Sequence, residues 1–89
     1  MDYQWDPDKE AANRAKHRVR FADAVPVLED ERAIVLDDDY LDEERFAAIG
    51  MDALGRVLVV VYTYRNSDIR IISARRATAK EQQYYQGEI

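Results

Sequence analysis

The sequence contains no cysteine, which excludes disulfide bonds, thiol nucleophiles and metal sites built from thiolates. It has no apolar run long enough to cross a bilayer, and the acidic residues among its first ten positions do not fit a signal peptide. Two serines and one histidine offer no recognisable Ser-His-Asp arrangement, so acyl-transfer chemistry is not indicated. A chain of 89 residues has room for one domain, 1–89, and we expect it in the cytoplasm with no membrane partner.

Charged residues are abundant but are segregated along the chain. The formal net charge is −5, yet nine of the 18 acidic residues lie between Glu29 and Glu44, beside one basic residue. The other residues carry twelve bases against nine acids, and the stretch from Arg14 to Arg20 has four bases and no acid. One positive face on an acidic molecule is compatible with this pattern, and so is a nucleic-acid partner. The alternative is that opposite charges pair across an ordinary solvated surface.

Sequence periodicity and breaker residues predict an α+β fold. The expected elements are a short edge strand near 2–5, a helix from Asp6-Pro7 to about 17, a short helix at 21–28, strands at 33–36 and 45–50, two longer strands within 56–78, and a helix at 79–86. Pro26 should bend the helix at 21–28 or shorten its hydrogen-bonded part. They would form a small antiparallel sheet of about four main strands, flanked by two N-terminal helices and one short C-terminal helix. On the first helix, the inner side is expected to hold Ala11, Ala12, Ala15 and Arg14.

The stretch from Arg56 to Thr78 is expected to be the centre of the fold, as two long strands joined by a turn at Asn66-Ser67-Asp68. Both faces of the first strand are mostly apolar, so this strand should be central in the sheet. If the second strand is regular, Arg70 and Arg76 share one face and Arg75 lies on the other. Guanidinium groups on a core strand are unusual unless an anion meets them.

An ordered set of residues runs through most of the chain. It begins with Trp5-Asp6-Pro7, Lys9, Asn13, Lys16-His17, Val19 and Phe21, continues with Glu44-Arg45-Phe46, Ile49-Gly50, Gly55-Arg56, Leu58-Val59-Val60, Tyr62-Thr63 and Arg65, and ends with the segment from Arg70 to Thr78 and Glu81. From Tyr3 to Tyr85 this set resembles the BrnT toxin family. Two junctions depart from the family pattern, because Arg18 stands where Gly is common and Arg20 stands where Ser is common.

The resemblance implies a ribonuclease toxin of a type II toxin–antitoxin pair. Such toxins look like RelE-type toxins and cleave RNA without a metal ion or another cofactor. The implied partners are an RNA substrate and a BrnA-like antitoxin, a ribbon-helix-helix protein that blocks the toxin and represses the shared operon. DNA would be contacted only through the antitoxin. The resemblance also implies that His17 faces the arginines of the second long strand.

Metal-free RNA cleavage requires a base for the 2′-hydroxyl proton, cations for the phosphoryl charge and an acid for the leaving oxygen. His17 is the only histidine, which makes it the candidate acid or base; the alternative is a helix-end cation. Arg70, Arg75 and Arg76 are the candidates for phosphate binding, because guanidinium groups match phosphate oxygens. The alternative is that at least one of them pairs with an acidic residue of 37–44 or with Asp68.

Further candidates for contacts to RNA are Lys16, Arg18, Arg65 and Tyr62. A tyrosine such as Tyr62 or Tyr64 can stack on a base, although tyrosine in a central strand more often packs in the core. Tyr84 and Tyr85 are expected to dock the last helix or to meet the antitoxin. The acidic run from Asp37 to Glu44 lacks the spacing of a calcium loop and is interpreted as a solvated loop, with a basic antitoxin segment as a hypothetical partner.

A second function, from a different class, stays open at this point. The chain would then be a catalytically silent subunit that binds the antitoxin and modulates repression of the operon. The acidic composition and a last helix with one lysine favour this alternative. The intact Lys16-His17 pair and the segment from Arg70 to Arg76 favour the nuclease.

Overall fold

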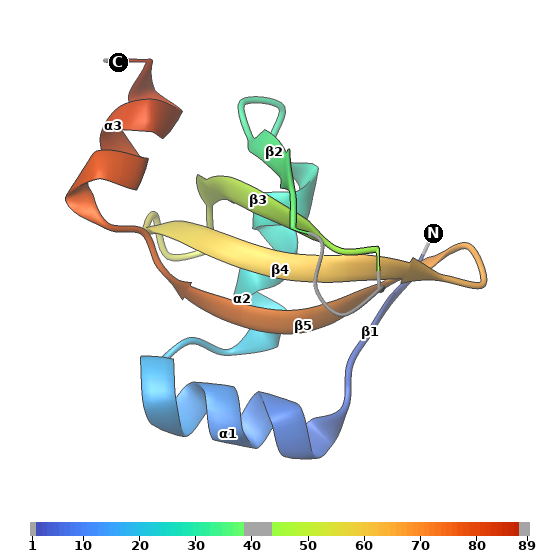
Figure 1. The fold of residues 1–89 in the computed structure, drawn as a ribbon. Coiled ribbons are helices and arrows are strands. Elements are labelled where there is room, and N and C mark those ends of the chain that lie inside the picture. Colours follow the sequence, from blue (N-terminus) through green and yellow to red (C-terminus); the bar gives the residue numbers. More distant parts are fainter. Residues whose placement is uncertain (1, 39–43, 88–89) are drawn as a thin grey trace.

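The computed structural model describes residues 2–38 and 44–87 (Figure 1). In chain order the elements are β1 (Tyr3–Gln4), α1 (Pro7–His17), α2 (Phe21–Ala24), the 3₁₀ helix η1 (Val25–Glu29), β2 (Ile34–Asp37), β3 (Phe46–Met51), β4 (Val57–Arg65), β5 (Asp68–Arg76) and α3 (Ala79–Gln86). In the described ranges the strands form one five-stranded sheet in the order β1-β5-β4-β3-β2. None of the described helices is long and apolar enough to cross a membrane.

The predicted α+β class is confirmed, but the prediction of an antiparallel sheet with about four main strands is incomplete. β1 adds a fifth strand that runs parallel to β5, with Tyr3 opposite Ile69 and Gln4 opposite Arg70, while the other neighbours are antiparallel. The sheet is therefore mixed. A two-residue strand has no periodicity of its own, so its partner and direction are decided by the free edge of β5.

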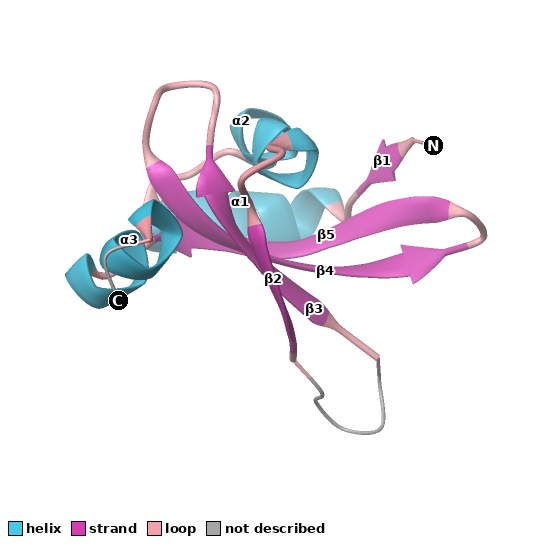
Figure 2. Cartoon of the chain, turned by 90° about the horizontal axis from the view of Figure 1, so that it is seen from above, coloured by secondary structure: helices cyan, strands magenta, loops and turns pink. Residues whose placement is uncertain are grey.

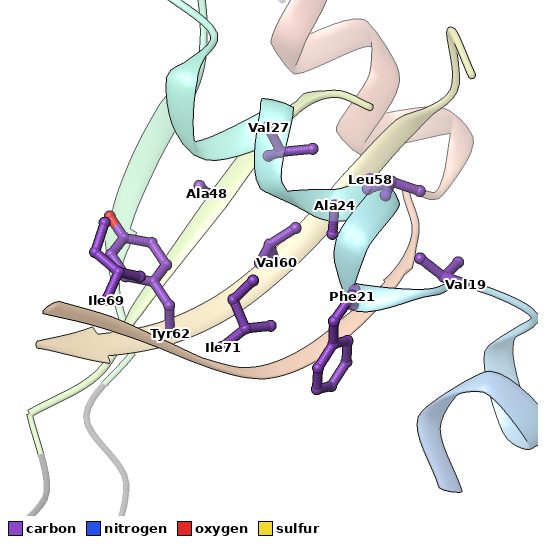
Figure 3. Close-up of a cluster of buried hydrophobic side chains, with 11 residues drawn as sticks. Val19, Phe21, Ala24, Val27, Ala48, Leu58, Val60, Tyr62, Ile69 and Ile71 are labelled. Atoms are coloured by element: carbon purple, nitrogen blue, oxygen red, sulfur yellow. The ribbon is translucent and has the colours of Figure 1, made fainter. Parts of the chain in front are cut away.

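β4 lies between β3 and β5, as its two apolar faces predicted. Paired residues on antiparallel neighbours point to the same face of a sheet. On one face, side chains of β3, β4 and β5 pack under α2 and η1 (Figure 3), in a cluster of Val19, Phe21, Ala24, Val27, Ala48, Leu58, Val60, Tyr62, Ile69, Ile71 and Ala74. As Pro26 predicted, the second helix is short: α2 has four residues and passes into the 3₁₀ helix.

The side of α1 that faces the protein is polar. The prediction that Ala11, Ala12, Ala15 and Arg14 lie on this inner side is therefore wrong. The alanines and Arg14 are exposed, whereas Asn13 is only 8% exposed and Glu10 and His17, on the same side, are half-buried. Asn13 accepts from the Ala74 N–H at 3.0 Å, and its Nδ2 donates to the carbonyl oxygens of Ala74 at 2.8 Å and Val19 at 3.1 Å. β1 pairs only with Ile69 and Arg70 of β5. Further along this edge, the side-chain amide of Asn13 makes the hydrogen bonds to Ala74 that a neighbouring strand would otherwise make. Backbone polarity at that edge favours a polar side chain over an apolar one.

The predicted caps and turns are present. Asp6 accepts from the Asp8 N–H at 2.8 Å, and Thr78 with Glu81 forms the capping box of α3. α1 ends at Arg18 in the left-handed conformation, φ 60°, which glycine adopts at least cost. The β4–β5 turn has two positive φ angles, 52° at Asn66 and 74° at Ser67.

α3 packs on the opposite face of the sheet from α2, at the end where β5 finishes (Figures 1 and 2). The β4–β5 turn lies at the other end (Figure 2). Tyr85 of α3 contacts the apolar cluster of Ile49, Val59 and Ala77, and its hydroxyl donates to Asp30 Oδ2 at 2.6 Å. This hydrogen bond raises the pKa of Tyr85 and fastens α3 to the segment after η1.

Candidate nucleic-acid interface

A β-bulge in β5 decides which arginines share a face of the sheet. Thr63 pairs with Arg70 and Val59 with Arg75, but the register shifts between Val61 and Tyr62, which leaves Ile72 as the extra residue. An extra residue reverses the alternation of side chains beyond it. Arg70 and Arg75 therefore lie on one face. Arg76, opposite Leu58, lies on the other.

The prediction that Arg70 and Arg76 share a face is therefore wrong, and Arg75 is the residue on the face of Arg70. That prediction assumed that side chains alternate regularly between the two faces from Arg70 to Arg76, but the bulge interrupts this alternation. Nothing in the sequence of this segment marks the position of the extra residue.

Arg75 is paired with an acidic residue of α3. Its Nη1 and Nη2 donate to the Glu81 carboxylate at 2.8 Å and 2.9 Å. These hydrogen bonds lower the pKa of Glu81 to about 2 and raise that of Arg75. Ion pairing was the alternative for these arginines, but the partner is Glu81, not Asp68 or the acidic run. Most of that run, residues 39–43, lies outside the described residues. The Arg75 side chain is 41% exposed, but its guanidinium is bound to Glu81 of α3 and is not an open phosphate site.

Arg70 belongs to a basic pocket of about 530 Å³ at the end of the sheet near the β4–β5 turn. Four of its eight lining residues are cationic, and the lining consists of Lys9, Glu44, Arg45, Thr63, Tyr64, Arg65, Arg70 and Ile72. Arg70 Nη1 donates to Gln4 Oε1 at 3.1 Å, which orients the guanidinium from β1. We call the cations Lys9, Arg45, Arg65 and Arg70 the basic pocket group.

Sequence reasoning predicted two members of this group, Arg65 and Arg70, and did not select Lys9 and Arg45 as site residues. Lys9 comes from the first turn of α1 and Arg45 from the residue before β3. Only the packing of α1 along β5 and the pairing of β3 with β4 bring them to the pocket. Both belong to the ordered set that carries the family resemblance, which was the one signal available.

A second group, at the end of α1, consists of the cations Lys16, Arg18 and Arg76 together with His17. Lys16, Arg18 and Arg76 are exposed and His17 is half-buried. Arg56 Nη1 donates to the Arg18 carbonyl oxygen at 3.5 Å, so the residue after α1 lies beside the start of β4. β5 ends next to this point, because Arg76 pairs with Leu58. We call these four residues the helix-end group.

The basic pocket group and the helix-end group are far apart. His17 lies four helix residues beyond Asn13, a rise of about 6 Å. Arg70 lies three paired positions before Ala74, since Ile72 is the extra residue of the bulge, and this is about 10 Å. Asn13 and Ala74 are in contact, and α1 runs in the direction of β5 (Figure 1). The backbones of His17 and Arg70 are thus separated by roughly 16 Å along the strand direction. His17 therefore does not face Arg70, and the only β5 arginine at its level is Arg76.

The prediction that Tyr62 contacts RNA does not fit the structure. Tyr62 is 6% exposed and packs against Phe46 and Tyr64, with ring centroids 5.6 Å and 5.9 Å away. Burial, followed by interactions with Tyr64, raises the pKa of Tyr62. Tyr64 itself is 54% exposed and lines the basic pocket, so it is the tyrosine whose ring a base can reach. On α3, Tyr85 docks the helix as expected, while Tyr84 is 53% exposed.

Among residues 2–38 and 44–87, no group of three or more His, Cys, Asp or Glu side chains is arranged to hold a metal ion.

Buried Asp52 accepts from Arg56 at 2.8 Å and 2.7 Å, which closes the β3–β4 connection and neutralises Arg56.

Comparisons with known proteins agree on one family. Residues 5–81 match the family described as "ribonuclease toxin, BrnT, of type II toxin-antitoxin system". The chain is also similar to the ribonuclease toxin BrnT of Brucella abortus, known from a crystal structure, with 30% identity and a TM-score of 0.71. That alignment covers 88% of this chain and 97% of the Brucella chain. A comparison with curated proteins gave no match.

Proposed function

Because the chain belongs to the BrnT family of ribonuclease toxins of type II toxin–antitoxin systems, we propose that it is a metal-independent endoribonuclease with a RelE-like fold. The observation that carries this proposal is the family match over residues 5–81. Its antitoxin is a BrnA-like ribbon-helix-helix protein, through which DNA is contacted indirectly.

In the proposed reaction, His17 is the proton acceptor. Neutral His17 takes the proton of a ribose 2′-hydroxyl as that oxygen attacks the adjacent phosphorus, and the bond from phosphorus to the 5′ oxygen breaks. The leaving 5′ oxygen takes a proton from water, and the hydroxide so formed takes the proton from His17, which is then neutral again. Arg76 and Lys16 neutralise the charge that grows on the phosphoryl oxygens. Support for these roles comes from the helix-end group, which holds one proton acceptor among permanently charged side chains.

The basic pocket group binds the same RNA strand away from the cleavage point. Its cations suit phosphate groups, and the exposed Tyr64 ring at its border suits stacking by a base. With roughly 16 Å between His17 and Arg70, an extended single strand reaches both groups. A single strand also leaves the 2′-hydroxyl free to adopt the geometry for attack.

The test is cleavage of labelled single-stranded RNA in the presence of a chelator. We expect His17→Gln and Arg76→Ala each to lower the cleavage rate by about 100-fold. Arg70→Ala should raise KM more than it lowers kcat. Arg14→Ala removes an exposed charge of α1 outside both groups and is the matched control, expected to leave the rate within about twofold.

Cleavage that survives both His17→Gln and Arg76→Ala would overturn the assignment of the helix-end group.

A second candidate function is the catalytically silent subunit that binds the antitoxin and modulates repression of the operon. The Arg75–Glu81 pair favours it, because that pair removes one cation from contact with RNA. Absence of cleavage, together with normal growth of cells that express the chain without its antitoxin, would select this second function.

A further inference from the structure

The outer edge of β2 has backbone N–H and C=O groups that form no hydrogen bond within residues 2–38 and 44–87. β2 is the last strand in the sheet order, and within the described ranges no strand pairs with its outer side. The Asp38 N–H donates to the Arg45 carbonyl at 2.9 Å, and β2 residues pair with β3 in register with this bond. Because hydrogen-bonded and non-bonded pairs alternate in antiparallel strands, Ile34 and Leu36 point their N–H and C=O toward β3. Val35 and Asp37 point theirs outward.

The side chains at this edge are apolar and exposed on both faces of the sheet. Val35 is 53% exposed and Leu36 is 50% exposed. Edge strands usually carry a charge, a proline or a covering segment at such positions, since an uncovered apolar edge pairs with other chains. An uncovered edge with two exposed apolar residues is therefore a surface for strand pairing.

A small pocket lies beside each of these residues. Val35, on the face of Ala48, borders a pocket of about 130 Å³ whose lining includes Val27, Leu28 and Tyr62. Leu36, on the opposite face, borders a pocket of about 190 Å³ lined also by Ile49, Lys80, Glu81 and Tyr84. Side chains of an added strand alternate between the two faces. Successive apolar residues of such a strand would thus enter the two pockets in turn.

We propose that the outer edge of β2 is the docking site of the antitoxin, which adds an extended segment to the sheet as a sixth strand. The inference rests on the proposed function, since it requires an antitoxin partner. The segment pairs with the N–H and C=O groups of Val35 and Asp37, places apolar side chains in the two pockets, and carries lysine or arginine opposite Asp37 and Asp38. Addition of a strand at a free sheet edge gives affinity through the main chain and specificity through the side-chain pockets.

Charge decides between this partner and a second copy of the chain. Asp37 and Asp38 are exposed at the end of β2. A second β2 strand has no cation among its four residues to pair with Asp37 and Asp38, whereas a basic segment neutralises both carboxylates.

The test uses the proposed BrnA-like antitoxin and two variants at one position. Val35→Pro removes the outward N–H, which the fold itself does not use, while Val35→Ile keeps it. We expect Val35→Pro to weaken antitoxin binding at least about 30-fold with a Tm close to that of the wild type. Val35→Ile should bind within about threefold. In the complex, hydrogen exchange by NMR should show the amides of Val35 and Asp37 newly protected.

Three outcomes would overturn the proposal: Val35→Pro binding as tightly as Val35→Ile, unchanged exchange at Val35 and Asp37, or a wild-type dimer in sedimentation that Val35→Pro abolishes. Asp37→Lys should lower the affinity as well, and unchanged affinity would contradict the charge complementarity. Failure of the edge assignment is distinct from failure of the proposed function. In the first case the wild type binds the antitoxin and Val35→Pro has no effect on the affinity. In the second case the wild type does not cleave RNA, whatever the affinity for the antitoxin.

Discussion

Replacement of Asn13 is expected to be among the most destabilising single changes in this chain. Asn13→Ala removes three hydrogen bonds, to the Ala74 N–H and to the carbonyl oxygens of Ala74 and Val19. Each contributes about 1 kcal/mol, and the buried Ala74 N–H left without a partner adds about 1 kcal/mol. The better helix propensity of alanine returns about 0.5 kcal/mol. The expected loss is thus about 3–4 kcal/mol, a large part of the free energy of unfolding of a domain of this size.

Urea denaturation followed by Trp5 fluorescence measures this loss, because Trp5 is the only tryptophan and packs edge-on against Phe21 at 5.9 Å. A loss of this size lowers Tm by roughly 12–30 °C. Asn13→Asp keeps the shape and the acceptor for the Ala74 N–H, but it loses both donations and places a carboxylate against two carbonyl oxygens. We expect it to destabilise the protein at pH 7 at least as much as alanine does.

Two results would refute this reasoning. A loss below about 1 kcal/mol for Asn13→Ala would show that water replaces the amide at the β5 edge. If Asn13→Asp were as stable as the wild type, the volume of the side chain would matter and its donors would not. Arg14→Ala, at the exposed neighbouring position, is the control and should change stability by less than about 0.5 kcal/mol.

Three further predictions concern the loop after α1, the β4–β5 turn and α3. Arg18→Gly should stabilise the protein by about 1 kcal/mol, since φ is 60° there, while RNA binding weakens; a lower Tm would contradict this. Ser67→Gly, at φ 74° in the turn, should stabilise by a similar amount in urea denaturation, whereas Ser67→Val should destabilise. The pKa of Glu81 is lowered from 4.5 to about 2, so its pair with Arg75 stabilises the fold fully above pH 4.5 and this contribution is lost as pH falls toward 2. Glu81→Gln should therefore lower Tm at pH 7 and approach the wild type near pH 2; an equal difference at both pH values would refute the assignment.

The helices and strands were predictable because their signals are local. Asp6 caps α1, Thr78 and Glu81 cap α3, and both faces of β4 are apolar. Each of these signals involves residues a few positions apart in the chain. Its structural effect therefore does not depend on how distant segments pack. The short second helix followed for the same reason from Pro26, whose missing N–H acts within one turn.

The inner face of α1 was not predictable from local pattern. Small apolar residues at 11, 12 and 15 suggested close packing, but α1 lies along an open strand edge and meets backbone N–H and C=O groups. Asn13 supplies the matching donor and acceptor. The backbone groups of Ala74 need this donor and acceptor because β1 pairs with only two residues of β5 and does not reach Ala74. This need arises from the tertiary structure and is not visible in the sequence around Asn13.

The candidate site was predicted in its residue types and not in its arrangement. The sequence by itself determined which cationic residues and which single histidine are available, and that two long strands form, the second of which contains Arg70 and Arg76. Tertiary structure alone decided that Arg70 joins Lys9 in a pocket, that His17 lies at the level of Arg76, and that Arg75 holds α3 through Glu81. The pocket and the level of His17 depend on the packing of α1 along β5, which joins residues far apart in the sequence. The face of Arg75 depends on the extra residue at Ile72, because one unpaired position reverses every side chain beyond it, and only the pairing of β5 with β4 shows where that position is.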